Sequence, residues 1–479
     1  MVPDSFEILK SVWTVLGPHF GTDKAPPEFW AHLKRRFLDA WELIQPGLNG
    51  ETVDWITLEE NCRKAGVLLA GLLLTISVWV VNARSIEAPC KACGKRPVRR
   101  WRDRTLKTSC GKVPIFRQEN DCHCGACSIP ADKLLGLDSD DRVSPCLKLW
   151  AGKLGASLPF KQSSRFFWDW TGQNILSAQG VHDQVAELGA ALPEMNAVAP
   201  ATTPGRPPER IVADLDGAVV SLHHTAMPQA KPEERPVTKP VKKVKHRFEV
   251  MVARTYERHD VLYGGVHLYR HLAFTGGVSR AGDDVPLAVF NLVNRRFPAA
   301  VSERTVYVRG DGAQNIDTIA KQFPHAKRLL DMYHTLVKVT ERIKGAFPDL
   351  PSKQRRAIDD ELSDLLRKGD ADAILARLSA LETHPKLRSA ESLERLAKHI
   401  DKHRDHLWYD EAKKLGLGVG TGITEKDVDL VLDRRFELRG MSWSPQGVQR
   451  ALRIRLTMFN DTPDSLVAAA AHRQPRPSS

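Results

Sequence analysis

Short apolar runs that end close to acidic residues mark the second half of the chain. Val306–Val308 is apolar and β-branched and stops shortly before Asp311, a pattern typical of a buried strand with a carboxylate at its C-terminal end. A helical pattern follows, and a second short strand over residues 327–330 precedes Asp331 and His334. Open α/β sheets carry their chemistry at strand ends arranged in this way, so we expect an α/β fold with a site near these residues.

More strands are predicted upstream of this unit. Residues 211–220 form an apolar run that contains Asp214 and Asp216. Because side chains of a strand point alternately to opposite faces, these two carboxylates are expected on the same face. Residues 248–255 and 261–266 predict two additional strands.

The pattern becomes wholly helical after His334. Residues 335–414 carry Leu and Ala at spacings of three and four residues and show no strand signal, which predicts a large helical insertion. A glycine-rich loop, residues 415–422, closes it, and a new helix is expected near Glu425 after Thr424. The loop lacks the Lys-Ser/Thr that a phosphate-binding P-loop needs.

The first part of the chain is also predicted to be helical, with aromatic residues among charged ones. Its most apolar run, Ala65–Val81, follows Arg63 and Lys64 and just reaches the lower length limit of a membrane span. The same run is typical of a core helix or a dimerisation helix. We favour a buried helix of a soluble protein.

Two C-x-x-C motifs predict a metal site. Cys90 and Cys93 form the first motif, and Cys124 and Cys127 form the second. Two such knuckles on hairpins allow four thiolates to close a tetrahedral, structural Zn²⁺ site. Cys122 lies beside the second motif and is an alternative ligand to Cys124, whereas buried free thiols are the alternative to a metal site.

A helical region follows the cysteine motifs. Residues 144–191 predict two or three short helices, broken near residues 157–159 and at residues 171–172, with Ser177 as the cap of the last one. A short helix, a turn and a capped helix are compatible with a helix-turn-helix DNA reader. A plain helical packing domain is the alternative.

Basic residues indicate an anionic partner. The chain has 70 Lys and Arg against 58 Asp and Glu, a net charge of +12, which favours nucleic acid over a merely soluble basic protein. One basic segment follows the first knuckle and includes Arg99, Arg100 and Arg102. Another is the Pro- and Lys-rich segment 227–245, which includes Lys242 and Lys243. Both are candidate DNA contacts, and solvated charged surfaces are the alternative.

Length and cysteine usage bound the remaining choices. The 479 residues allow two to four domains. Seven of the eight cysteines lie between Cys90 and Cys146, and no signal peptide is recognisable, so we expect a reduced, cytoplasmic setting. The predicted regions are an N-terminal helical region (1–87), a zinc-ribbon-like module (88–135), a helical region (140–191), a linker (192–209), a first core segment (210–334), a helical insertion (335–414), a second core segment (415–465) and a disordered tail (466–479).

Three acidic residues share a setting at strand ends or a helix start: Asp216, Asp311 and Glu425. If they converge, their carboxylates repel one another unless hard divalent cations neutralise them. Two such ions activate a water or a 3′-hydroxyl and stabilise the leaving oxygen of a phosphodiester. Spacing alone does not prove convergence, so three separate caps or surface carboxylates are the alternative. Asp214 competes with Asp216 as the first of the three.

Four motifs resemble the DDE transposases of bacterial insertion sequences. They are DGA at Asp216, VRGDGAQNI around Asp311, LLDMYH at Asp331–His334, and GTGITE followed by RRFELRGMSW from Glu425 to Trp443. The similarity points to the Kra-type family, related to the Mutator-like group. It spans roughly residues 88–460 and includes the paired cysteine motifs and ADKLLGLD near Ala131.

The resemblance implies a ribonuclease-H-like core with a helical insertion between the second Asp and the Glu. It implies that Asp216, Asp311 and Glu425 are the catalytic residues and bind Mg²⁺ or Mn²⁺, with Asp331 and His334 in a supporting role. Asp216 is preferred to Asp214 because the glycine after it matches the motif.

The last motif adds further residues. Arg435, Gly440 and Trp443 match the family's Arg…Gly-x-x-Trp signature, which implies packing and DNA contact near the catalytic helix. The chain has Gly420-Thr421-Gly422 where the family more often has Gly-Ser-Gly, a change that keeps a hydroxyl.

The sequence therefore predicts an insertion-sequence transposase that binds terminal inverted repeats, cleaves DNA and transfers the 3′-hydroxyl to a target. Its zinc-ribbon and helical region precede the core and would read the DNA. Expected partners are DNA and, because two ends must be brought together, further copies of the chain; no small-molecule substrate and no membrane are expected. A nucleoid-associated cytoplasmic location follows. The alternative is a catalytically inactive, transposase-derived, zinc-dependent DNA-binding protein.

Overall fold

The structure is a computed structural model, mixed α/β and mostly helical. It describes residue 14 and residues 25–48, 54–84, 89–138, 141–194, 210–221, 247–263, 266–298, 302–420, 422–438, 441–460 and 462–471. The chain divides into two compact units, residues 1–191 with 467–479, and residues 192–466. The boundary at Ala191 coincides with the start of the predicted linker.

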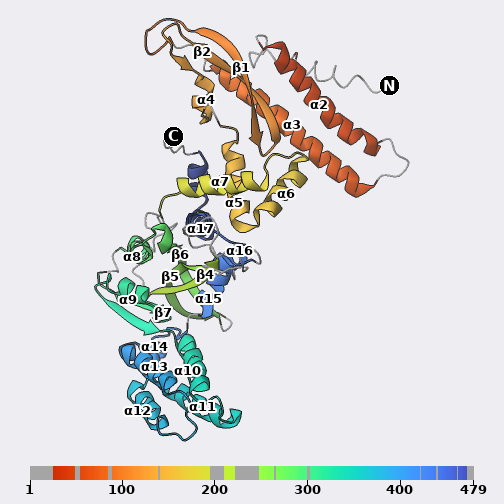
Figure 1. Ribbon diagram of the computed structural model, residues 1–479. Coiled ribbons are helices and arrows are strands. Elements are labelled where there is room, and N and C mark those ends of the chain that lie inside the picture. The colour runs from red at the N-terminus through yellow and green to blue at the C-terminus, as the bar shows by residue number, and fades with distance from the viewer. Residues whose placement is uncertain are drawn as a thin grey trace, which may run out of the picture. The chain divides into compact units, whose positions relative to one another are not determined.

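In the first unit, two long helices pack beside a β-hairpin (Figure 1). The helices are α2 (Pro27–Leu48) and α3 (Trp55–Arg84), and the hairpin pairs β1 (Val98–Thr108) with β2 (Gly111–Asp121). Apolar residues of α2, α3 and β2 form a common core that includes Phe29, Trp79 and Phe116. The short β3 (Cys127–Ser128) adds to β2, and α4 (Pro130–Leu135) follows.

Helix α3 contains the apolar run that the sequence left open between a membrane span and a core helix. By length and composition Trp55–Asn82 qualifies as a span, which is weak evidence because core helices pass the same test. Its polar side chains bind the edge of β2 that β1 leaves free: Thr75 Oγ1 donates to Pro114 O (3.1 Å), and Asn82 Oδ1 accepts from Gln118 N–H (3.2 Å). A helix that covers an open sheet edge in this way is typical of a soluble core.

The rest of the first unit consists of three short helices. They are α5 (Pro145–Ser157), α6 (Phe160–Thr171) and α7 (Ala178–Ala191), broken where the sequence predicted. Ser177 Oγ accepts from Gly180 N–H at 3.1 Å and so caps α7. Their core includes Leu147, Phe167 and Val181.

The second unit is built on a five-stranded mixed sheet with the order β6-β5-β4-β7-β8. The strands are β4 (Ile211–Ser221), β5 (Arg247–Tyr263), β6 (Val266–Gly277), β7 (Val306–Gly310) and β8 (Ala326–Leu330). Strands β4, β5 and β6 are antiparallel neighbours, whereas β4, β7 and β8 are parallel. The strand predicted at 261–266 is wrong: it is the end of β5 and the start of β6, because pairing continues past a register shift between Arg258 and Leu262.

Helices cover both faces of this sheet. On one face, α8 (Val285–Arg296) and α9 (Gln314–Ala320) pack on odd-numbered residues of β4 and on Val306 and Val308. On the other face, Val212, Tyr256 and Leu330 join the core of the helical insertion. The insertion comprises α10 (Met332–Ala346), α11 (Ser352–Lys368), α12 (Ala371–Leu381), α13 (Ala390–Lys402), the turn η7 (Arg404–His406) and α14 (Tyr409–Lys414).

The insertion begins and ends at one place. Met332 N–H, at the start of α10, donates to Val419 O at 3.0 Å, immediately before the chain returns to the sheet. After the insertion, the chain continues into α15 (Gly422–Val428), the short π-helix η8 (Asp429–Asp433), α16 (Arg434–Phe436), α17 (Pro445–Phe459) and α18 (Pro463–Ala471). Residues 466–471 were predicted as part of a disordered tail and are helical; residues 472–479 lie outside the described residues.

Candidate active site and candidate metal centre

The parallel pairing of β4 and β7 places two of the predicted acids side by side. Asp214 is directly opposite Arg309; Asp216 is two residues further along β4, and Asp311 is two residues beyond Arg309, just after the end of β7 at Gly310. Equal steps along both strands keep the side chains on the same face, and neighbouring strands are about 4.8 Å apart. Asp311 follows β7 directly, and its Oδ1 accepts from Ala313 N–H at 3.0 Å, which fixes the turn into α9.

Helices bring two more predicted residues to this point. Glu425 is in the first turn of α15, and His334 is in the first turn of α10. His334 Nε2 lies 3.8 Å from Glu425 Oε1, and its Nδ1 lies 3.4 Å from Asp331 Oδ1. Asp331 is buried and caps α10 by accepting from His334 N–H at 2.7 Å. These contacts place Glu425 close to His334, which in turn lies beside Asp331.

Electrostatics confirm that the acids influence one another. The pKa of Asp216 is raised to about 6, chiefly by burial; the charges of Asp311 and Glu425 contribute to the rise, whereas the Gly217 N–H and the charge of His334 oppose it. The Asp331 carboxylate raises the pKa of His334, with smaller contributions from Asp216 and Glu425, against the effect of burial. Three acids from distant segments therefore share one electrostatic neighbourhood, although their ligand atoms do not all lie within 4.8 Å of one another, as those of the cysteine cluster do.

Asp214, the competing candidate, has a different environment. It is buried, and Arg309 donates to both of its oxygens, from Nε to Oδ1 and from Nη2 to Oδ2, each at 2.6 Å. Tyr256 Oη donates to Oδ2 at 3.2 Å, and Thr424 Oγ1 does so at 3.4 Å. Arg309 also binds the carbonyl oxygen of Gly418. Asp214 therefore ties β4, β5, β7, the glycine loop and α15 together rather than facing the other acids.

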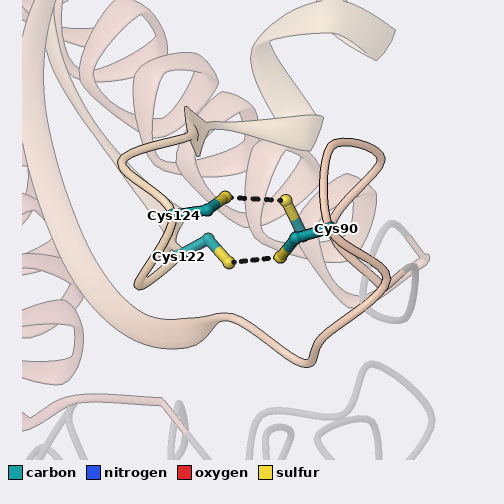
Figure 2. Close-up of side chains that lie close together, drawn as sticks. Cys90, Cys122 and Cys124 are labelled. Atoms are coloured by element: carbon teal, nitrogen blue, oxygen red, sulfur yellow. Dashed lines mark hydrogen bonds between the residues drawn. The ribbon is translucent and has the colours of Figure 1, made fainter.

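The cysteine cluster is in the first unit. Cys90, Cys93, Cys122 and Cys124 have sulfur atoms that all lie within 4.8 Å of one another, and none is in a disulfide. The Sγ atoms of Cys90 and Cys124 are 3.6 Å apart, and those of Cys93 and Cys122 are 3.4 Å apart. A tetrahedron with Zn–S bonds of about 2.3 Å has S···S distances of about 3.8 Å, so the cluster could hold a metal ion such as Zn²⁺. Figure 2 shows Cys122 and Cys124 on one loop, facing Cys90 on the other.

The prediction of Cys127 as a ligand is wrong. Cys127 is at the start of β3, where its Sγ lies 3.4 Å from Glu119 Oε1, and burial followed by this carboxylate raises its pKa. Cys122 takes its place, so the second knuckle is C-x-C. Cys122 does not substitute for Cys124; both belong to the cluster.

The signal that identifies the second knuckle is the glycine after its last cysteine. Gly94 follows Cys93 and Gly125 follows Cys124, and both have a positive φ, 71° and 84°. In each knuckle this glycine N–H donates to the carbonyl of the first cysteine, at 2.8 Å. Only glycine adopts this backbone conformation readily, so Cys-Gly marks the end of each knuckle.

The predicted DNA-contacting residues fall into three groups. Arg99, Arg100 and Arg102 are exposed on β1, and Arg102 Nε pairs with Glu119 Oε2 at 2.7 Å. Their alternation along the strand places Arg99 on the face opposite Arg100 and Arg102. Lys242 and Lys243 lie outside the described residues.

Arg435 and Trp443 form the third group, and both are buried rather than available to DNA. Arg435 is 0 % exposed, and its guanidinium lies 4.5 Å from the centre of the Trp443 ring. Burial, and then the charge of Arg455, lowers the pKa of Arg435 to about 9. The backbone N–H of Trp443 donates to the carbonyl oxygen of Ser221, at the end of β4, at 2.9 Å. This pair packs the segment after α15 against the sheet, so the predicted DNA contact by these two side chains is wrong for this conformation.

Comparison with known proteins adds no family: no protein-family model matches the chain, and no curated protein matches it.

Proposed function

We propose that this protein is a DDE-type transposase that cuts DNA and joins the 3′-hydroxyl to a target. The observation that carries the proposal is the placement of Asp216 level with Asp311 on neighbouring parallel strands, with Glu425 and His334 within electrostatic reach. Two further features support a ribonuclease-H-like core: the mixed five-stranded sheet, and the helical insertion between Asp311 and Glu425.

The chemistry of the acid set fits a hard divalent cation. The charges of Asp311 and Glu425 contribute to the raised pKa of Asp216, and a cation would relieve the same repulsion. Asp216, Asp311 and Glu425 would hold Mg²⁺ or Mn²⁺, which supplies activation of a water or 3′-hydroxyl and stabilises the leaving oxygen of the phosphodiester.

The surrounding residues position these acids. Asp331 orients His334, and His334 contacts Glu425. The imidazole therefore helps to position Glu425, which is the most distant of the three acids along the chain. The pKa of His334 is raised, chiefly by Asp331, which favours the protonated imidazole beside Asp216. The charge of His334 in turn opposes the rise in the pKa of Asp216 and so favours its ionised, ligand-competent form.

The first unit would bind the DNA. A cysteine cluster that holds zinc stabilises a small ribbon, and three short helices with a capped last helix suit a DNA-reading module. A cytoplasmic, nucleoid-associated location and a homo-oligomer that brings two DNA ends together belong to the same proposal.

The test is strand joining by the full-length protein. The substrate is a duplex from the DNA that flanks the coding sequence, with supercoiled plasmid as target and Mg²⁺ or Mn²⁺ as cofactor. Asp216→Asn, Asp311→Asn and Glu425→Gln are each expected to lower joining by at least about 10²-fold, because a metal ligand supplies several kcal/mol of transition-state stabilisation. Asp364→Asn, on an exposed face of α11, is the matched control and keeps activity.

Two outcomes contradict the proposal. Joining that is unchanged in Asp311→Asn removes the catalytic assignment. DNA binding without any joining by the wild-type protein identifies the inactive, zinc-dependent DNA-binding protein instead.

A further inference from the structure

A row of basic residues leads away from the candidate active site along α10. His334, Lys338 and Arg342 are four residues apart, so they lie on one side of the helix at intervals of about 6 Å. His334 contacts Glu425, and Lys338 Nζ donates to Asp311 O at 3.3 Å. Arg342 continues the row away from the acids, and among the described residues no carboxylate pairs with it.

Helix α13 forms the other side of this row. A cavity of about 360 Å³ lies between α10 and α13, lined by Lys338, Arg342, Arg395, Leu396, Lys398 and His399. Five of these six residues are basic. The two acids that reach its wall belong to α13 itself: Glu391 pairs with Arg395, and Glu394 pairs with Lys398 at 2.6 Å. Lys338 and Arg342, on α10, pair with no acid in the part of the chain that the structure describes, so the cavity keeps an excess of positive charge.

The cavity adjoins the loop that carries Asp311. Gly312 has a φ of +95°, and a Cβ added there would lie 3.1 Å from His403 Nε2 and 3.5 Å from His399 Cε1. Helix α13 therefore packs directly against the turn after β7. Burial, and then the charges of Lys338 and Lys402, lowers the pKa of His399 to about 4, so this residue is a neutral donor at physiological pH.

We propose that the cavity between α10 and α13 binds the phosphates of the DNA strand that enters or leaves the carboxylate site. The cavity has four cationic side chains, and one of them, Lys338, binds the backbone carbonyl of Asp311. Such a row of charges matches a chain of regularly spaced phosphates better than a single small anion. The inference rests on the proposed function, because it assigns the path of that reaction's substrate. It also gives the helical insertion a role: the insertion guides DNA as well as covering one face of the sheet.

The test measures how DNA affinity depends on salt. A duplex of arbitrary sequence is titrated with full-length protein in EDTA, so that no chemistry occurs, and log Kd is followed against log salt concentration. Replacing a residue that binds a phosphate lowers the magnitude of the slope by about 1. Lys338→Gln/Arg342→Gln is expected to lower it by about 2 and to weaken binding to all sequences equally. Arg342→Lys is expected to retain the wild-type slope, which separates loss of charge from loss of fold.

The matched control removes two charges elsewhere on the insertion. Arg377 and Arg388 pair with Glu361 and Asp349 and do not line the cavity, so Arg377→Gln/Arg388→Gln keeps the wild-type slope. An unchanged slope in Lys338→Gln/Arg342→Gln, or an equal decrease in the control, overturns the inference. The result is independent of catalysis: Asp311→Asn tests joining, whereas this experiment tests binding, so either proposal can fail alone.

Discussion

Replacing Arg309 with Met is expected to destabilise the second unit strongly, because it removes the guanidinium that donates to both oxygens of the buried Asp214. Asp214 is 1 % exposed and takes hydrogen bonds from Arg309 at both oxygens. The variant keeps the Tyr256 and Thr424 hydroxyls, at 3.2 and 3.4 Å, and the weaker ion pair with Arg254, whose Nε lies 3.9 Å from Asp214 Oδ2. Breaking a buried pair by removing one partner costs about 3–5 kcal/mol.

Hydrogen exchange of peptides that cover β4 and β7 measures this cost within the unit. A loss of about 3–5 kcal/mol raises the opening equilibrium constant, and with it the exchange rate, by roughly 10²- to 10³-fold or more. The surface pair of Arg388 and Asp349 is the control: both side chains are more than half exposed, and Arg388→Met is expected to cost at most about 1 kcal/mol.

A second variant tests the cause. Asp214→Asn/Arg309→Met also removes the charge of Asp214, so it is expected to recover a large part of the lost protection. Wild-type exchange rates in Arg309→Met refute the reasoning, and so does a double variant that is as unstable as the single one.

Two further predictions concern the metal centre and pH. Cys122→Ser is expected to lose zinc on elemental analysis because it removes a cluster ligand, whereas Cys127→Ser keeps zinc; the opposite result would restore Cys127 as the ligand. Because the pKa of Asp216 rises from 3.8 unfolded to about 6 folded, the folded chain binds more protons between these values, so stability falls as pH rises from about 4 to 6 and stays low above it. In metal-free buffer at pH 7, Asp216→Asn is therefore expected to be more stable than wild type by about 2–3 kcal/mol in denaturant titration. If the variant and the wild type are equally stable at pH 7 as well as at pH 4, the raised pKa of Asp216 is contradicted.

The strands and helices could be predicted where their pattern was local. The strand before Asp311, the strand before Asp331 and the long helical insertion follow from short apolar runs and helical spacing. The pairing of β4 with β7 could not be predicted, because register depends on contacts between segments far apart in the sequence. That register is what makes Asp216 level with Asp311.

The site residues that were misassigned share one cause: a side chain's environment is a tertiary property. The sequence placed Asp214 and Asp216 on one face correctly, yet only the position of Arg309 on the neighbouring strand separates the buried carboxylate from the available one. The resemblance implied both packing and DNA contact for Arg435, and its side chain is enclosed with Trp443. Cys127 was selected before Cys122 because C-x-x-C spacing is the more familiar pattern. The glycine after Cys124 indicated that Cys124 ends the knuckle and that Cys122 begins it.

The hydrogen bond from Met332 to Val419 holds the two ends of the insertion together. Lengthening a segment whose ends are held together costs little, because each doubling of its length adds only about 0.6 kcal/mol of loop-closure entropy. Residues can therefore be gained or lost in the distal turn 382–389 while Asp331 and Glu425 keep their separation. If the insertion guides DNA as proposed, its length sets how much of the substrate is held, and that length can change without moving the acids.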